Sequence, residues 1–266
     1  MPSAAKGERL DQALVRQGLV PGRSQAQAVV LAGLVLIDGQ PASKPGQRVA
    51  PSAELAVRPR PHLASRAGGK LEAALDRFGV DPAGRLCLDV GASTGGFTDC
   101  LLQRGAARVY AVDVGYGQLL WRLRQEPRVV VLERTNARYL TADHVPEPIS
   151  LAVFDVSFIS LAKVVPAALC RMDPDGQVIC LVKPQFEAGP RDVPRGGVVR
   201  DPAVHRRVLG DVSASLQALG LRLQDLMPSP VKGAEGNQEF LWCGVRGADA
   251  ADPSPAIEQA LEAVAR

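Results

Sequence analysis

The sequence lacks the marks of a membrane-spanning or disulfide-stabilised protein. No apolar run approaches the roughly 18 residues that a transmembrane helix needs. The first ten residues contain no apolar stretch of the secretory type, so we expect no signal peptide. The five cysteines are scattered, odd in number and free of any Cys-x-x-Cys pair. We therefore expect buried thiols in a reducing compartment, no bound metal and a cytoplasmic protein.

Lysine is scarce as well, with 6 lysines against 25 arginines, and each lysine is more informative for that reason. The net charge of +3 is unevenly placed. Residues 1–66 hold nine basic and four acidic side chains, whereas residues 67–266 carry a net charge of −2. A basic front end on a nearly neutral body predicts a polyanion-binding module attached to a second domain. A chain of 266 residues has room for both.

The basic front end has the pattern of a small α+β module. Apolar residues recur at helical spacing over 10–19 and again over 24–32. An apolar strand over 34–37 then runs into the turn Asp38-Gly39, and a further strand is expected near 55–57. The Pro-rich stretch 58–62 follows, and it predicts an extended connection between two domains.

The rest of the chain alternates apolar strands with helical stretches. Such strands, each buried on both faces, predict a parallel sheet covered by helices on both sides. A late strand within 231–245 is expected to be antiparallel. The predicted parallel strands are 86–90, 108–113, 129–132, 151–155 and 177–183.

Ligands of a doubly wound sheet bind beyond the carboxyl ends of its strands, where this chain places Asp89, Asp113, Asp155 and Lys183. The Gly-rich loop that starts at Asp89 is neither a Walker loop nor a Gly-x-Gly-x-x-Gly turn. Asp113 follows the next strand, where an acid can accept both hydroxyls of a ribose. The pattern favours an adenosine-bearing ligand without a pyrophosphate, with S-adenosylmethionine as the first candidate and a dinucleotide as the alternative.

Two resemblances follow from these motifs. The segments Arg9-Leu-Asp-Gln-Ala-Leu14 and Gly33-Leu-Val-Leu-Ile-Asp-Gly39 resemble the S4 RNA-binding domain. A second set of motifs, in their order along the chain, resembles the FtsJ-like ribose methyltransferases. Both together resemble the TlyA family, ribosomal RNA cytidine-2′-O-methyltransferases historically labelled haemolysins. The motifs of the second set are Ser65-Arg-Ala-x-x-Lys70, Asp89-x-Gly-x-x-x-Gly-Gly-Phe97, Phe154-Asp155, Val182-Lys183 and Gln238-Glu239.

The resemblance implies a fold, its domains and a substrate. The expected fold is α/β, a Rossmann-like class I S-adenosylmethionine-dependent methyltransferase behind a small α+β S4 domain. The expected substrate is RNA of the ribosomal subunits, with the protein as a monomer and with no membrane partner. The expected divisions are an S4-like domain at 7–62, a linker at 63–69, a methyltransferase domain at 70–246 and a C-terminal tail at 247–266.

The resemblance also implies site residues. We expect Lys183 to take the proton of the ribose 2′-hydroxyl, Lys70 to orient its oxygen, Asp155 to hold Lys183 and Glu239 to fix the lysine geometry. The expected cofactor contacts are Asp89, Gly91, Ser93, Thr94, Gly95, Gly96, Phe97, Asp113, Asn136 and Asp155. The expected RNA contacts are Arg9, Arg16, Arg23, Lys44, Arg48, Arg66, Arg191 and Arg195.

Three other functions compete with this one. The first is a non-catalytic RNA-binding factor for ribosome assembly that keeps the methyltransferase fold. The second is a pore-forming lytic protein, which the old haemolysin label suggests and which no long amphipathic helix supports. The third is a small-molecule methyltransferase, which the fold alone allows.

Overall fold

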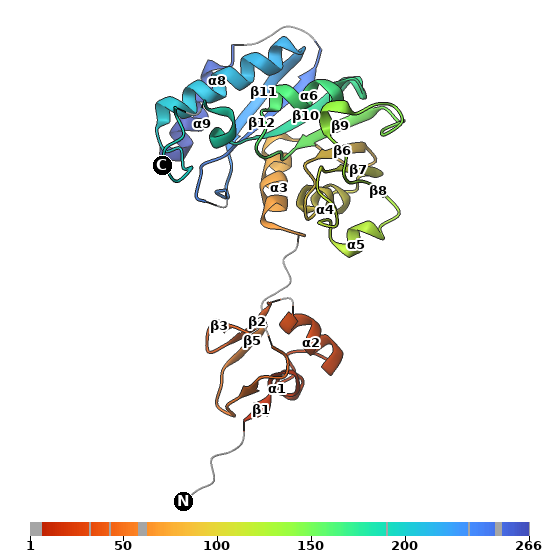
Figure 1. Cartoon of the computed structure of the whole chain (residues 1–266), viewed down its shortest axis with the longest axis vertical. Coiled ribbons are helices and arrows are strands. Elements are labelled where there is room, and N and C mark those ends of the chain that lie inside the picture. The colour runs from red at the N-terminus through yellow and green to blue at the C-terminus, as the bar shows by residue number, and fades with distance from the viewer. Residues whose placement is uncertain are drawn as a thin grey trace, which may run out of the picture. The chain divides into compact units, whose positions relative to one another are not determined.

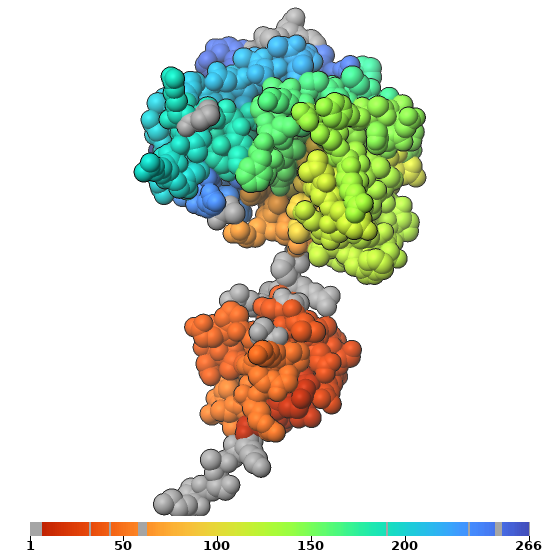
Figure 2. Space-filling view, viewed as in Figure 1, coloured from red at the N-terminus to blue at the C-terminus, as the bar shows by residue number. Residues whose placement is uncertain are grey.

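The chain folds into two units, Met1–His62 and Leu63–Arg266. The computed structural model describes residues 7–31, 33–42, 44–57, 63–189, 191–233, 235–247 and 252–265. Each unit has a hydrophobic core of its own, and the space-filling view shows each as a separately packed body of side chains (Figure 2). The Pro-rich stretch 58–62 lies outside the described residues.

The first unit is the α+β module that its sequence pattern predicts. Two helices pack together over a small core that includes Leu10, Leu14 and Val30. Strand β2 pairs with β3 and β5, and β1 pairs with β4 (Figure 1). The elements are β1 (Glu8–Arg9), α1 (Leu10–Arg16), α2 (Arg23–Leu31), β2 (Val35–Ile37), β3 (Gln40–Pro41), β4 (Arg48–Val49) and β5 (Leu55–Val57).

The second unit is built on a seven-stranded sheet in the order β11-β12-β10-β9-β6-β7-β8. The five strands from β10 to β8 are parallel, and β12 runs antiparallel to both β10 and β11. The α/β class and the late antiparallel strand are thus confirmed. The strands are β6 (Leu86–Val90), β7 (Arg108–Val112), β8 (Val129–Leu132), β9 (Ile149–Phe154), β10 (Met172–Val182), β11 (Leu221–Pro228) and β12 (Phe240–Arg246).

Helices cover both faces of this sheet because its central strands are apolar on both sides. Leu88 and Val90 of β6 pack toward one face with residues of α6, α8 and α9, whereas Cys87 packs toward the other with α3 and α4. Figure 1 shows α3 and α4 below the sheet and α6 and α8 above it. The helical elements are α3 (Arg66–Phe78), α4 (Gly96–Gln103), α5 (Trp121–Arg124), η1 (Ala137–Tyr139), α6 (Leu161–Leu169), α7 (Pro184–Glu187), α8 (Pro202–Ala218) and α9 (Ser254–Ala265).

The cysteines are free, and four of the five are buried, as the sequence predicts. Burial raises the pKa of the Cys87 and Cys243 thiols to about 12, so both stay protonated at neutral pH. Cys170 is the exposed one.

The predicted linker at 63–69 is wrong over its second half. Residues 66–69 form the first turn of α3, which Ser65 caps by accepting a hydrogen bond from the Ala67 amide. Gly68 is buried where α3 crosses α4, and a Cβ added to it would lie 2.8 Å from the Gly96 carbonyl oxygen. The glycine is therefore a close-packing residue of the second unit.

The sequence predicts either a short amphipathic helix or a frayed tail at 255–266, and the structure has the helix. Helix α9 buries Ile257, Ala260 and Leu261 against the core of the second unit and packs on β11 and α8. Strand β11 itself was not predicted from the sequence.

Candidate active site

The site lies where the order of the strands reverses. From β6 the chain proceeds outward through β7 to β8 and then returns to place β9 on the other side of β6. The carboxyl ends of β6 and β9 are therefore neighbours, and the crevice beyond them is where such folds bind ligands. Gly91, which follows β6, has φ +90°, and a Cβ there would lie 2.5 Å from the Asp155 carbonyl oxygen. Only glycine allows this approach.

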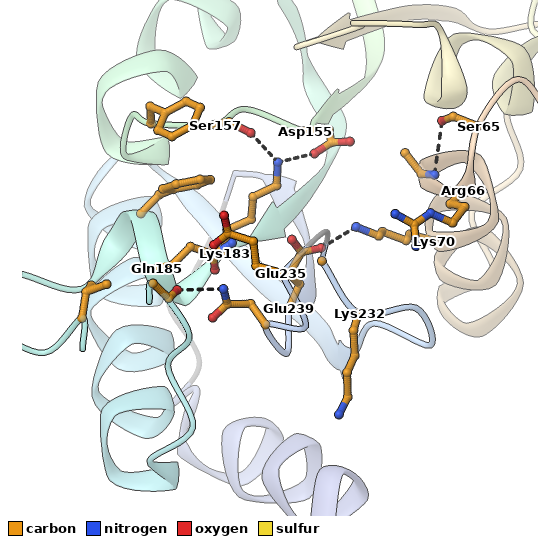
Figure 3. A pocket seen from close by; sticks show the side chains of 17 residues that line it. Ser65, Arg66, Lys70, Asp155, Ser157, Lys183, Gln185, Lys232, Glu235 and Glu239 are labelled. Atoms are coloured by element: carbon orange, nitrogen blue, oxygen red, sulfur yellow. Dashed lines mark hydrogen bonds and ion pairs between the residues drawn. The ribbon is translucent and has the colours of Figure 1, made fainter. Parts of the chain in front are cut away.

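Three cavities meet at Asp155, which directly follows β9. One, of about 330 Å³, runs from Gly91 past Asp113 to Asn136. A second, of about 100 Å³, lies under the loop after β6 and is lined by Thr94, Gly96 and Phe97, among others. The third, of about 590 Å³, contains Lys70, Lys183 and Glu239 (Figure 3). Asp155 lines all three, so a ligand in the first two would present its reactive end to the third.

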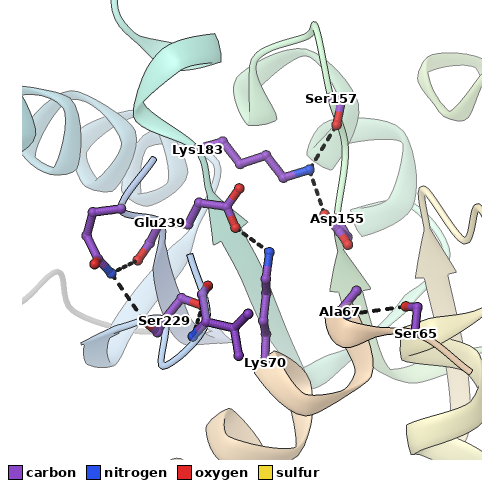
Figure 4. Close-up of polar contacts among 10 residues, drawn as sticks. Ser65, Ala67, Lys70, Asp155, Ser157, Lys183, Ser229 and Glu239 are labelled. Carbon is purple, nitrogen blue, oxygen red and sulfur yellow. Dashed lines mark hydrogen bonds and ion pairs between the residues drawn. The ribbon is translucent and has the colours of Figure 1, made fainter. Parts of the chain in front are cut away.

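The largest cavity holds two lysine–carboxylate pairs. Lys70 of α3 lies 2.5 Å from a carboxylate oxygen of Glu239, which directly precedes β12. Lys183, at the end of β10, donates to Asp155 at 2.7 Å and to the Ser157 hydroxyl at 2.9 Å (Figure 4). Both lysines are only 8% exposed. Burying a cation is costly without a partner, so each pair explains why its lysine is tolerated there.

These pairs come from four elements that are distant in the sequence. Lys70 and Glu239 are 169 residues apart, and α3 brings the lysine across the sheet edge to meet β12. Figure 4 shows both amines directed toward the same space. The arrangement can hold a hydroxyl group between two amines while each amine keeps a carboxylate for charge balance.

The side-chain carboxylate of Asp113 accepts hydrogen bonds from backbone amides, one of them in the loop after β6. One carboxylate oxygen accepts from the Ser93 amide at 2.7 Å and the other from the Gly115 amide at 2.6 Å. The Ser93 hydroxyl also hydrogen-bonds Gln118 at 3.2 Å. Asn136 lines the same cavity, and its side chain caps η1. Polar groups thus line the 330 Å³ cavity at Asp113 and Asn136.

Two of the predicted cofactor residues lie elsewhere. Asp89 is fully buried under the loop and lines none of the cavities described here. One of its oxygens accepts from the Thr98 hydroxyl at 2.6 Å, and the other has no hydrogen-bond partner among the described residues. Burial, opposed in part by this hydrogen bond, raises the pKa of Asp89 to about 7. Gly95 lies against α5, where a Cβ would meet Leu123.

The predicted RNA contacts divide between the two units. In the second, Arg66 lines the largest cavity, whereas Arg191 and Arg195 lie exposed on a loop whose neighbours Val193 and Gly197 line it. In the first unit, Arg9 and Arg23 pair with Asp11, Arg16 pairs with Glu8, Arg48 donates to the Gly7 carbonyl, and Lys44 is exposed.

The sequence reasoning missed several residues of the largest cavity. Ser157 follows Asp155 by two residues and accepts a hydrogen bond from Lys183. Phe158, at φ +63° and 88% exposed, contacts Phe186 with 4.7 Å between ring centroids and the ring planes tilted by 46°. Lys232 lines the rim. The scarcity of lysine was the available signal for Lys232, because three of the chain's six lysines line this one cavity.

Two further searches cover the described part of the chain. None of its helices combines the length and the apolar character that crossing a bilayer requires. Its described residues hold no group of three or more His, Cys, Asp or Glu side chains placed to bind a metal ion.

Comparison with known proteins identifies the family of the chain. The FtsJ-like methyltransferase model matches residues 63–246, and the S4 domain model matches residues 8–55. The chain is 50% identical over 241 residues to the 16S/23S rRNA (cytidine-2′-O)-methyltransferase TlyA of Mycobacterium tuberculosis, covering 90% of each protein. It is 39% identical to Hemolysin A of Brachyspira hyodysenteriae, covering 88% of this chain and 98% of that protein.

A solved structure from Streptococcus thermophilus that carries a hemolysin name superposes with a TM-score of 0.76 at 40% identity. The match covers 98% of this chain and 97% of that one, so both units have counterparts there. The chain belongs to the TlyA family of FtsJ-like methyltransferases with an N-terminal S4 domain.

Proposed function

We propose that this chain transfers a methyl group from S-adenosylmethionine to the ribose 2′-oxygen of a cytidine in ribosomal RNA. The observation that carries the proposal is the position of Asp155, shared by a nucleoside-sized cavity and by the cavity of the two lysine–carboxylate pairs. The M. tuberculosis relative, at 50% identity, is named for this reaction on 16S and 23S rRNA. A ribosomal substrate also agrees with a cytoplasmic location.

The residues present fit the cofactor. The 330 Å³ cavity offers apolar walls for an adenine, with Asp113 and Asn136 as polar partners. The close approach of Gly91 to Asp155 leaves the loop backbone free to follow the methionine portion past Ser93. When bound, the cofactor supplies an electrophilic methyl group on a sulfonium.

The lysine pairs support the methyl transfer by position and by proton transfer. In its neutral form Lys183 takes the proton of the 2′-hydroxyl, and Asp155, at 2.7 Å, stabilises the ammonium that results. Lys70 donates to the same oxygen and keeps it in line with the methyl group, while Glu239 fixes Lys70 in place. Ser157 holds the Lys183 amine from a second direction.

The aromatic pair of exposed Phe158 and half-buried Phe186 supports an RNA substrate. A 2′-hydroxyl is absent from DNA, so the acceptor itself selects RNA. The nucleotide must leave its stack to bring this hydroxyl between the lysines. The rings of Phe158 and Phe186 line the cavity and offer an extruded base a stacking surface.

The experiment is transfer of labelled methyl from S-adenosylmethionine to purified ribosomal subunits that lack the modification, followed by nucleoside mass spectrometry. We expect 2′-O-methylcytidine in at least one subunit. Cofactor binding without incorporation into either subunit would overturn the proposal in favour of a binding role.

A further inference from the structure

The carboxylate of Asp11, in α1, accepts hydrogen bonds from three side chains of the first unit. Arg9 contacts it through Nε and Nη2, each at 3.0 Å. Arg23 donates from Nε at 3.0 Å, and Gln27 donates from its amide at 3.2 Å. The carboxylate is fully buried although both guanidinium groups reach the surface, with 39% of the Arg9 side chain and 55% of the Arg23 side chain exposed.

Among the described residues, the contacts with Asp11 leave N–H donors of both partly exposed guanidinium groups unused. They use Nε and Nη2 of Arg9 and only Nε of Arg23, so Nη1 of Arg9 and both terminal nitrogens of Arg23 retain N–H groups. The hydrogen bond from Arg9 holds the pKa of Asp11 well below its usual range. The carboxylate is therefore charged at any pH at which the protein functions.

The two arginines come from different elements, and without Asp11 they would repel each other. Arg9 precedes α1 and Arg23 begins α2, so each is anchored on a separate helix end. One buried negative charge between two guanidinium groups removes their repulsion and restricts their rotamers before any ligand arrives. A preorganised pair loses less entropy on binding than two independent side chains do. Planar guanidinium groups with free N–H edges bind phosphate well.

We propose that Asp11 is a positioning residue that holds Arg9 and Arg23 together as one binding site for a phosphate of the RNA backbone. The inference rests on the proposed function, because it assigns the first unit's arginines to the RNA substrate. The competing explanation is that the network only ties α1 to α2.

The two explanations predict opposite changes in RNA affinity for one isosteric substitution at Asp11. Asp11→Asn removes a negative charge, so charge alone makes RNA binding equal or tighter. Loss of the held pair makes binding weaker instead. We expect the full-length variant to bind unmethylated ribosomal subunits at least about fivefold more weakly, with a salt dependence shallower by about one phosphate contact. KM for the subunits should rise while kcat stays unchanged.

Asp38→Asn is the matched control. Asp38 also lies in the first unit, among the described residues it accepts a hydrogen bond only from the Glu54 amide, and its substitution changes the charge by the same amount. We expect this variant to bind as tightly as the wild type or more tightly. A folded Asp11→Asn variant that behaves like Asp38→Asn would overturn the proposal.

A second variant keeps the test valid if Asp11→Asn does not fold. Arg23→Lys keeps the charge but cannot hold Asp11 and also present two outward nitrogens. It should weaken binding by a similar factor, and wild-type affinity in this variant would overturn the proposal as well. A wild-type chain that neither binds nor methylates the subunits would instead refute the proposed function, so the two failures are distinguishable.

Discussion

Each unit buries one aspartate completely, and the two carboxyl groups have opposite surroundings. Asp11 in the first unit is held by two arginines, which keep it ionised. Asp89 in the second has one hydroxyl partner and one oxygen with no partner among the described residues. Burial raises its pKa to about 7, and the nearby Asp155 and Asp113 add to this effect. The same residue type is a permanent charge in one unit and a titrating group in the other.

The basic side chains of the two units also differ in their exposure to solvent. In the first unit the acid is inside and its arginines reach the solvent, whereas the second buries the lysines themselves beside the cavity. A cation at the surface can neutralise a phosphate at long range. A buried cation can act only on a group that enters its cavity. We therefore expect the first unit to attract RNA and the second to perform the chemistry.

Removing the amine of Lys183 should have the largest effect. Lys183→Ala takes away the amine that accepts the proton, and we expect methyl transfer to fall by about a thousandfold, within the range for loss of a general base. S-adenosylmethionine affinity, measured by calorimetry, should stay within about twofold, because the lysine lines the acceptor cavity and not the 330 Å³ one. Lys163→Ala, at an exposed lysine of α6, is the control and should keep full activity. Residual activity above a tenth of wild type would remove Lys183 from this role.

Removing the surface cations together should have the next largest effect. A chain of residues 63–266 keeps every described cavity and its own core, so cofactor binding should be intact. We expect affinity for the ribosomal subunits to fall about a hundredfold. The slope of log Kd against log salt should decrease by about 3 if Arg9 and Arg23 share one phosphate and Arg16, Lys44 and Arg48 each neutralise another. An unaltered slope would contradict the assignment of RNA attraction to the first unit.

The sequence predicted those parts of the structure that depend on local pattern. Apolar residues fill β7 after Arg108 and all of β6 except Asp89, as burial on both faces of a sheet favours, and β8 at the edge is apolar throughout. Strand β11 escaped notice because Arg222, Gln224 and Asp225 interrupt its apolar residues, as suits a strand at the sheet edge. The linker at 63–69 was expected from the family resemblance, whereas Gly68 lies in the first turn of α3 and contacts Gly96 of another helix.

In the candidate site, too, the sequence did not predict what depends on tertiary contacts. Family motifs identified Lys70, Asp155, Lys183 and Glu239, but spacing along the chain does not say which lysine faces which acid. That depends on how α3 packs against β12, a tertiary contact between segments 169 residues apart. Phe158 lies in an ordinary stretch of sequence, and only the left-handed backbone at this position and its exposure mark it as unusual.

The contrast between the two buried acids predicts a pH dependence of stability. Folding raises the pKa of Asp89 from 3.8 to about 7, so the folded chain holds this proton more tightly than the unfolded chain. The contribution of Asp89 to stability is thus fully present below pH 4 and is lost as the pH rises toward 7. The variant Asp89→Asn has no carboxyl group to ionise at this position and so does not lose this stability. The difference in unfolding free energy between the variant and the wild type should therefore increase by about 2 kcal/mol, in favour of the variant, between pH 5 and pH 7. Urea unfolding at several pH values measures it, and parallel profiles for the two proteins would contradict it.

The smallest expected effect tests where the second unit begins, since α3 carries Lys70. Gly68→Ala places a methyl group 2.8 Å from both the Gly96 carbonyl oxygen and the Leu63 side chain, and overpacking of this kind costs about 1–3 kcal/mol. Gly69→Ala meets nothing within 4 Å, and in a helix it should stabilise the protein by about 0.5–1 kcal/mol. Thermal unfolding of the two variants should therefore move in opposite directions from the wild type. If these residues formed a flexible linker, both variants would instead unfold at the wild-type midpoint temperature. Helix α3 would then begin after Gly69, and Lys70, in its first turn, would lack the packing that holds the lysine against Glu239.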